Sequence, residues 1–111
     1  TGEISVASVG TFDWVLFCGV FYHLRHPFHD LERIAAIAGH TLVLETRLVG
    51  RFERQPKMRF YPGSELDGDP TNWWAPNRPC IEAMLRDLGF RTIRFRYPDW
   101  RFRRGIFHAE R

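Results

Sequence analysis

Tyr22 and His23 are the first side chains in this sequence whose chemistry stands out, because they directly follow a long apolar run. Glu45 holds the same kind of position after a second apolar run, residues 42–44. Ligands of open α/β sheets bind outside the carboxyl ends of the strands, so we expect a site at these positions. An unperturbed histidine titrates near neutral pH, which suits His23 either for general-base catalysis or for capping the loop that follows. Glu45 is expected to orient a substrate hydroxyl or amine.

Several arginines are candidate partners for these groups. Arg25 and Arg47 offer Glu45 an alternative, purely structural role as half of an ion pair across the strand ends. Arg104 follows Arg103 in an arginine-rich stretch near the C-terminus. A guanidinium suits a carboxylate because it donates two parallel, charge-assisted hydrogen bonds. The same stretch is also typical of a solvated sheet edge, which is the alternative interpretation.

Two adjacent tryptophans, Trp73 and Trp74, follow Asn72 in a segment rich in proline and glycine. Neighbouring indole rings can stack on a planar substrate ring. We therefore expect Asn72, Trp73 and Trp74, together with Arg25, on the substrate side of the site. The alternative is a lid that packs against the sheet.

Three histidines, His23, His26 and His29, recur at a spacing that invites a metal-site interpretation. Pro27 lies inside this run, and a loop that turns into a helix does not bring three ligands together with fixed supporting hydrogen bonds. We expect no metal here.

The element that must position Tyr22 is a strand over residues 12–20, whose continuous apolar character is typical of a central strand covered on both faces. Apolar residues at steps of three and four predict a helix over residues 28–38, ended by Gly39. A second buried strand is predicted over residues 41–46. Strand, helix and strand then form a right-handed parallel crossover.

Residues 48–77 break this pattern, because glycine and proline recur too often for a long helix or a central strand. Their aromatic content argues against disorder, so we expect an ordered insertion or lid over the strand ends. A helix over residues 80–88 and an antiparallel pair of strands over residues 91–97 and 105–109, at the sheet edge, complete the chain.

The length of 111 residues is enough for one domain and too small for two independent cores. A net charge of +3 favours anionic ligands but is weaker than the charge of a dedicated nucleic-acid coat. Two cysteines, Cys18 and Cys80, do not form a disulfide framework of the secreted type, and the longest apolar run is too short to span a membrane. We expect a reduced, cytoplasmic protein with no membrane partner.

The sequence FDWVLFCGVFYHL, residues 12–24, resembles the fourth strand of class I S-adenosylmethionine-dependent methyltransferases. Further motifs follow in the order found in the tRNA wobble-uridine carboxymethyltransferases: RHP at 25–27, LVLET at 42–46 and LGF at 88–90. FYPG at 60–63 and DPTNWWAPN at 69–77 resemble an insertion found in bacterial members of that branch. The ordered set covers nearly the whole chain.

This resemblance implies a fold class: α/β, as the C-terminal half of a Rossmann-like doubly wound sheet. The chain would hold strands four to seven, the last two antiparallel, plus a long insertion, as one partial domain over residues 1–111. No Gly-rich turn of the G-x-G-x-G type occurs and the chain begins at Thr1, so we expect a longer native protein. We also expect this chain alone not to bind S-adenosylmethionine usefully.

The resemblance also implies roles for individual residues. In the carboxymethyltransferases, the residues that match Tyr22 and Arg104 hold the carboxylate of carboxy-S-adenosylmethionine, while a lysine partner lies outside the matched half. The position of Cys18 corresponds to a wall of the cofactor site, although a lone cysteine in an apolar strand is also a common core residue. Glu3 lies where an acidic loop on the adenine side begins.

Three functions remain open from the sequence. The first is transfer of a methyl or carboxymethyl group from S-adenosylmethionine or its carboxylated form, with a tRNA uridine or a small molecule as acceptor. The second is a noncatalytic half-domain that associates through an exposed sheet edge with itself, as a homo-oligomer, or with a partner chain. The third is nucleic-acid binding without catalysis, which rests only on net charge and aromatic content.

Overall fold

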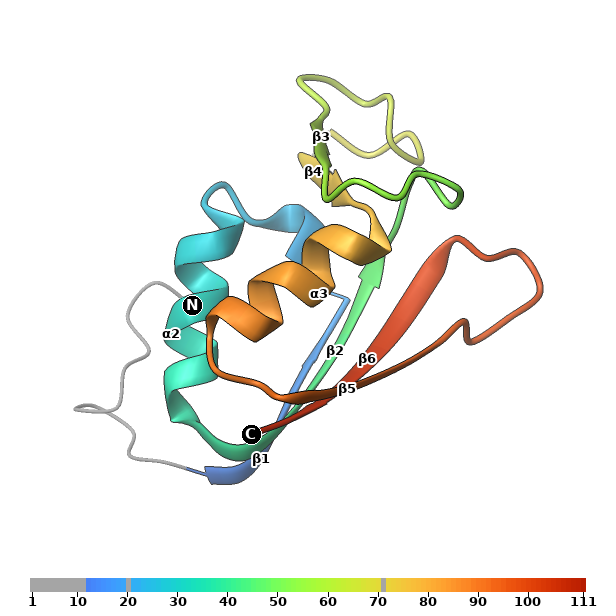
Figure 1. Ribbon diagram of the computed structural model, residues 1–111. Coiled ribbons are helices and arrows are strands. Elements are labelled where there is room, and N and C mark those ends of the chain that lie inside the picture. The colour runs from blue at the N-terminus through green and yellow to red at the C-terminus, as the bar shows by residue number, and fades with distance from the viewer. Residues whose placement is uncertain (1–11, 20, 71) are drawn as a thin grey trace.

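The computed structural model describes residues 12–19, 21–70 and 72–111 (Figure 1). Its main sheet has four strands in the order β1-β2-β6-β5. The strands are β1 (Phe12–Cys18), β2 (Ala38–Arg47), β5 (Thr92–Arg96) and β6 (Arg104–Glu110). β1 and β2 are parallel, and β6 runs antiparallel to both β2 and β5. The predicted antiparallel pair is confirmed, with β5 at the edge of the sheet and β6 inside it.

Short helical elements connect the strands: η1 (Phe21–His23), α2 (Pro27–Ile37) and α3 (Arg78–Asp87). α2 carries a proline in its first turn, where the missing N–H has no helical partner in any case. α3 begins at Asn77, whose side-chain oxygen accepts a hydrogen bond from the Cys80 backbone N–H at 2.9 Å. Among the described residues, no helix has the length and apolar character needed to cross a bilayer.

The hydrophobic core lies between the sheet and the two helices, which both lie on one side of it (Figure 1). Leu31 of α2, Ile81 and Leu85 of α3 and Leu42, Leu44 and Phe107 of the sheet are fully buried there. Complete burial of large apolar side chains is the main stabilising contribution in a domain of this size.

The other face of β1 is open within the described part of the chain. Trp14 is 59% exposed and Leu16 71% exposed, whereas Phe17, which points to the helices, is 5% exposed. The expectation that this strand is covered on both faces is therefore wrong for the described residues. Its continuous apolar sequence does not reveal which of its two faces the rest of the chain covers.

The insertion forms a small unit of its own at the end of β2 (Figure 1). β3 (Met58–Phe60) pairs antiparallel with β4 (Trp74–Pro76), and Tyr61, Leu66 and Ala75 form a second buried cluster. These two strands were not predicted, because three residues are too few to show an alternating pattern and Pro76 belongs to one of them.

The predicted boundaries shift by a few residues. The largest shift is at β2, which begins at Ala38 with no link after α2, because Ala38 already pairs with Phe12 of β1. Gly39 thus lies inside a strand rather than at a helix end, so its role as the helix stop was wrong.

Candidate functional site

Three side chains from three elements meet where β1 and β2 end. Arg104 of β6 donates a hydrogen bond from Nη1 to the Tyr22 hydroxyl at 3.2 Å and from Nη2 to Glu45 Oε1 at 2.9 Å. We call Tyr22, Glu45 and Arg104 the carboxyl-end cluster. Its members are far apart in sequence, so the sheet topology is what assembles them.

Gly19 leaves room directly above this cluster. A Cβ at this position would lie 3.8 Å from Arg104 Nη2, 3.9 Å from Glu45 Oε1 and 4.0 Å from the Tyr22 hydroxyl. Its φ of +70° lies in the left-handed region that favours glycine. The sequence interpretation missed this residue, although a glycine right after an apolar strand at a predicted site was the available signal.

The charges of the cluster balance each other. The Arg104 pKa is raised above its ordinary value, mainly by the hydrogen bond to Glu45 and further by Tyr22, against the opposing effect of burial. Arg104 therefore stays a cation at every relevant pH. A guanidinium has five N–H donors, and two are used here, so the cluster can still accept one more anionic group.

Glu45 pairs with Arg104 and not with the arginines that the sequence offered as structural partners. Arg47 instead forms an ion pair with Asp67 at 2.9 Å, and the Arg25 guanidinium lies 4.0 Å from the centre of the Trp73 ring.

The tryptophans attach the insertion next to Tyr22. The Trp73 backbone N–H donates to the Tyr22 carbonyl at 2.8 Å, and the Trp74 indole N–H donates to the Arg25 carbonyl at 3.3 Å. Both indole rings are half-buried. Arg25, Trp73 and Trp74 thus form one border of the carboxyl-end cluster.

Asn72 lies inside the insertion. It is 4% exposed, and its side-chain amide donates to the Leu66 carbonyl at 2.9 Å. Its side-chain oxygen is buried without a hydrogen-bond partner among the described residues.

The remaining candidates surround the cluster or lie elsewhere. His23 is exposed, with its ring centre 4.4 Å from that of Tyr22. Cys18 is exposed and is the register partner of Glu45 in the neighbouring strand. Glu3 lies outside the described residues. Within the described part of the chain, no group of three or more His, Cys, Asp or Glu side chains is placed to hold a metal ion.

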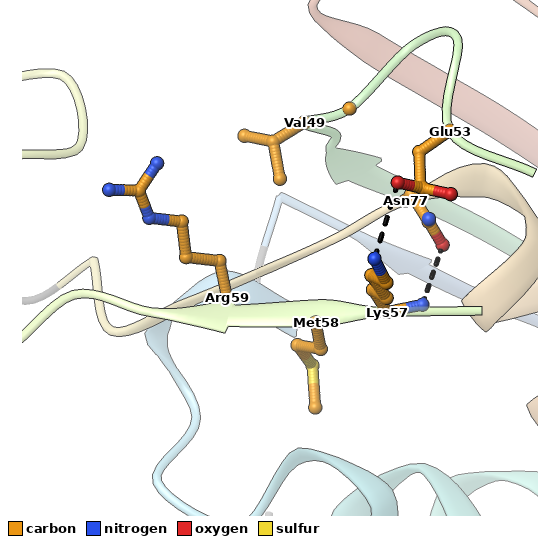
Figure 2. A pocket seen from close by; sticks show the side chains of 7 residues that line it. Val49, Glu53, Lys57, Met58, Arg59 and Asn77 are labelled. Atoms are coloured by element: carbon orange, nitrogen blue, oxygen red, sulfur yellow. Dashed lines mark hydrogen bonds and ion pairs between the residues drawn. The ribbon is translucent and has the colours of Figure 1, made fainter. Parts of the chain in front are cut away.

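A larger pocket, of about 670 Å³, lies beside β3 and is separate from the cluster (Figure 2). Glu53 and Lys57 form an ion pair at 3.3 Å across it, and the pKa of the Glu53 carboxyl is lowered by the Gln55 backbone N–H and by Lys57. Asn77 accepts from the Lys57 backbone N–H at 3.1 Å and donates to the Gln55 carbonyl. Glu53, Lys57 and Asn77, on the pocket wall, are thus committed to holding the loop together.

No protein-family model matches the chain. The chain is 34% identical over 93 residues to the tRNA U34 carboxymethyltransferase of Pseudomonas putida (strain W619). These matched residues cover 79% of this chain and 27% of that relative. The tRNA U34 carboxymethyltransferase of Syntrophotalea carbinolica is 31% identical over 93 residues, which cover 82% of this chain and 28% of the relative. The chain therefore spans about a quarter of the length of these relatives.

A solved structure, the N-terminal domain of EvdMO1 with SAH bound, superposes on 97% of this chain with a TM-score of 0.64 and 20% identity. The match covers 49% of that chain. The predicted resemblance and the predicted α/β fold, as part of a methyltransferase-like domain, are confirmed by these likenesses.

Proposed function

We propose that this chain is the part of an S-adenosylmethionine-dependent transferase that holds the group to be transferred. The donor is S-adenosylmethionine or carboxy-S-adenosylmethionine, and the product is a methylated or carboxymethylated acceptor. The carboxyl-end cluster is the observation that carries this proposal. It lies at the ends of two parallel strands, where open α/β sheets bind their ligands.

The residues fit a donor that carries a carboxylate. Arg104 can donate further hydrogen bonds beyond those to Tyr22 and Glu45, and the Tyr22 hydroxyl can donate its own proton. Glu45 fixes the plane of the guanidinium but also cancels its charge. The proposal therefore gives Arg104 and Tyr22 a directional role, in which they orient the carboxylate rather than attract it by net charge.

Transfer from a sulfonium needs in-line placement and exclusion of water more than strong acid–base help. The bound donor would supply an electrophilic carbon. On this chain, Trp73 and Arg25 would limit access of water beside Tyr22, and Cys18 would line the donor. We assign to His23 the role of accepting the proton of an acceptor hydroxyl.

We favour a tRNA uridine over a small molecule as the acceptor. The curated relatives are named for a tRNA reaction, the chain carries a net charge of +3, and two tryptophans border the cluster. Such a substrate would place the protein in the cytoplasm.

Substitution of Tyr22 by phenylalanine tests the role of the cluster. In the complete natural protein that contains this chain, Tyr22→Phe should slow transfer from carboxy-S-adenosylmethionine about tenfold, because one hydrogen bond to a charged group is lost. Tyr61→Phe, a matched change in the insertion cluster, should leave the rate unchanged. Equal rates for the Tyr22 variant and the wild type would contradict the proposal.

The chain alone should not bind the donor usefully, because most contacts to the donor are expected elsewhere in such a domain. Calorimetric titration of the 111-residue chain with S-adenosylmethionine should give no measurable heat at micromolar concentrations. Micromolar affinity would contradict this expectation.

A second proposal is association of two copies through β1. This strand pairs only with β2 among the described strands, and its Trp14 and Leu16 side chains are largely exposed. An unpaired edge with an apolar face favours pairing with a second β1 edge. Light scattering after size exclusion should show a dimer of the chain that Leu16→Lys converts to a monomer, and a strict wild-type monomer would refute the pairing.

A further inference from the structure

Three adjoining hollows connect Arg104, past the tip of the β5–β6 hairpin, with residues 51–54 and the start of α3. The first, of about 170 Å³, is lined by Arg104, Arg47 and Arg103 among others. The second, of about 110 Å³, shares Arg47 and Arg103 with the first. The third, of about 520 Å³, shares Arg51 and Arg78 with the second. The surface is therefore continuous from the carboxyl-end cluster, past the hairpin tip, to residues 51–54 and the start of α3.

Arginine dominates this surface. We call the following residues the arginine track: Arg47, Arg51, Arg54, Arg78, Arg101 and Arg103. Together with Arg104 they give the three hollows seven arginines against four carboxylates.

Most of the track's charge is unpaired. Arg47 forms an ion pair with Asp67, and Arg78 forms one with Glu82. The other four arginines have no carboxylate within ion-pair distance among the residues that the structure describes, and all four are exposed. Exposed, unpaired guanidinium groups beside one another repel, so the track is a surface suited to a chain of anions.

Aromatic rings accompany these arginines. The Arg51 guanidinium lies 3.6 Å from the centre of the Phe102 ring and 5.0 Å from that of Phe52. The Arg101 guanidinium lies 5.6 Å from the centre of the Trp100 ring. Phe52 is 86% exposed and Trp100 78% exposed, so each has a free ring surface.

We propose that the arginine track binds the sugar-phosphate backbone of an RNA single strand or loop, with Phe52 and Trp100 stacking on its unpaired bases. The proposal rests on the proposed function, because it adds to the donor site a path for the acceptor. Its two ingredients, guanidinium groups for phosphates and exposed rings for bases, are those by which proteins hold single-stranded nucleic acid.

The geometry favours RNA over an acidic protein partner. An acidic peptide would use the arginines but would give the two exposed rings no planar surface to stack on. A base that undergoes chemistry must leave its stack, and the track ends at Arg104, where the proposed donor carboxylate lies. A nucleotide loop bound along the track would thus have one base within reach of the cluster.

Paired arginine substitutions test the track. Binding of a fluorescein-labelled anticodon stem–loop RNA with uridine at its wobble position is followed by anisotropy, in the complete natural protein and at several salt concentrations. Arg51→Gln/Arg103→Gln should weaken binding at least about tenfold and lower the salt slope by about 1.4, because each lost phosphate contact on a single strand removes about 0.7.

Arg86→Gln/Arg91→Gln is the matched control. Both residues are exposed, Arg86 in the last turn of α3 and Arg91 between α3 and β5, away from the hairpin tip. The double change removes the same net charge. This control should bind the RNA within about twofold of the wild type. An equal loss in both double variants would refute the track, since only the overall charge would then matter.

The aromatic part has its own test, with heparin as a polyanion that offers no bases. Trp100→Ala should weaken binding of the RNA about fivefold or more and leave heparin binding unchanged. An equal change in the affinities for RNA and for heparin in this variant would overturn the assignment to RNA. The track would then be a general polyanion-binding surface.

RNA binding by the track and the proposed group transfer can be refuted independently of each other. Titration with S-adenosylmethionine should give the same affinity in the wild type and in Arg51→Gln/Arg103→Gln. Wild-type RNA affinity in that variant, together with intact donor binding, would refute the track alone. Loss of RNA affinity in a protein that binds no donor would refute the transfer and leave the track standing.

Discussion

Neighbouring residues of one strand point to opposite faces of the sheet, and the two faces differ in how far they are buried. On β6, Phe107 points to the helices and is 0% exposed, whereas Ile106 and His108 point to the opposite face and are only half-buried. On β1, Phe17 is buried and Leu16 is 71% exposed. One face is thus a finished core, and the other is an apolar surface without a cover among the described residues.

The difference also separates stability from chemistry. The helix-covered face is built mainly from apolar side chains. Thr46 is a polar residue on this face, and it is fully buried, with its hydroxyl donating to the Arg47 carbonyl. Glu45 and Arg104 belong to the opposite face, as does Cys18, the register partner of Glu45. Ligand binding is therefore expected to depend on the opposite face, and folding on the covered one.

The largest effect on the free energy of unfolding is expected when a large side chain is removed from the covered face. Phe107→Ala should lower the free energy of unfolding by about 3–5 kcal/mol, because it leaves a cavity in the middle of the sheet. Ile106→Ala, one residue away on the other face, should lower it by about 1 kcal/mol. Urea denaturation of both variants measures this, and equal losses would break the comparison.

A smaller loss should follow from overfilling the covered face. A Cβ on Gly105 would lie 2.5 Å from Leu48 Cδ1 and 2.5 Å from Phe95 Cε1, so both side chains would have to move. Gly105→Ala should therefore lower the free energy of unfolding by about 1–3 kcal/mol. An unchanged urea midpoint would mean that Leu48 and Phe95 can move aside without loss of packing, which would contradict this prediction.

A polar substitution on the opposite face should barely affect stability. Leu16→Lys places its charge on a side chain that is already 71% exposed, so the monomeric chain should lose about 0.5 kcal/mol or less. The measurement is made at a protein concentration too low for pairing through β1. The same change in the complete natural protein sharpens the comparison. A loss of about 2 kcal/mol there would show that another part of that protein covers this face.

The alkylation rates of the two cysteines test the same contrast between buried and exposed positions without any substitution. Cys80 is 7% exposed, and burial raises the pKa of its thiol, which lowers its thiolate fraction near pH 8. Cys18 is exposed. Iodoacetamide should alkylate Cys18 at least about tenfold faster than Cys80, as followed by mass spectrometry of the digested protein. Similar rates would contradict the assigned faces.

The sequence predicted the elements of the main sheet but not the coverage of its faces. Regular apolar spacing identified α2 and α3, and the apolar runs identified β1 and β2, because local pattern determines local structure. The same runs were interpreted as buried on both faces. Burial depends on what packs against a strand. The sequence of an apolar run of seven residues such as β1 does not specify which of its faces another element covers.

The candidate site shows a similar division. Strand ends and the family resemblance singled out Tyr22, Glu45 and Arg104, which the structure brings into contact. The partner of Glu45 was not predicted, because Arg104 is distant in sequence and only the central position of β6 makes it a neighbour. The arginine track was likewise missed, since its members come from β2, the insertion, α3 and the hairpin tip.

Selectivity between the two donors tests the central claim most directly. The complete natural protein is titrated with carboxy-S-adenosylmethionine and with S-adenosylmethionine, as wild type, as Arg104→Gln and as Arg104→Gln/Glu45→Gln, the last to avoid an unpaired Glu45. If Arg104 orients the donor carboxylate, both variants should lose at least about tenfold in affinity for the carboxylated donor and less than about threefold for the other. Equal losses for the two donors would contradict the claim and reduce Arg104 to a structural partner of Glu45.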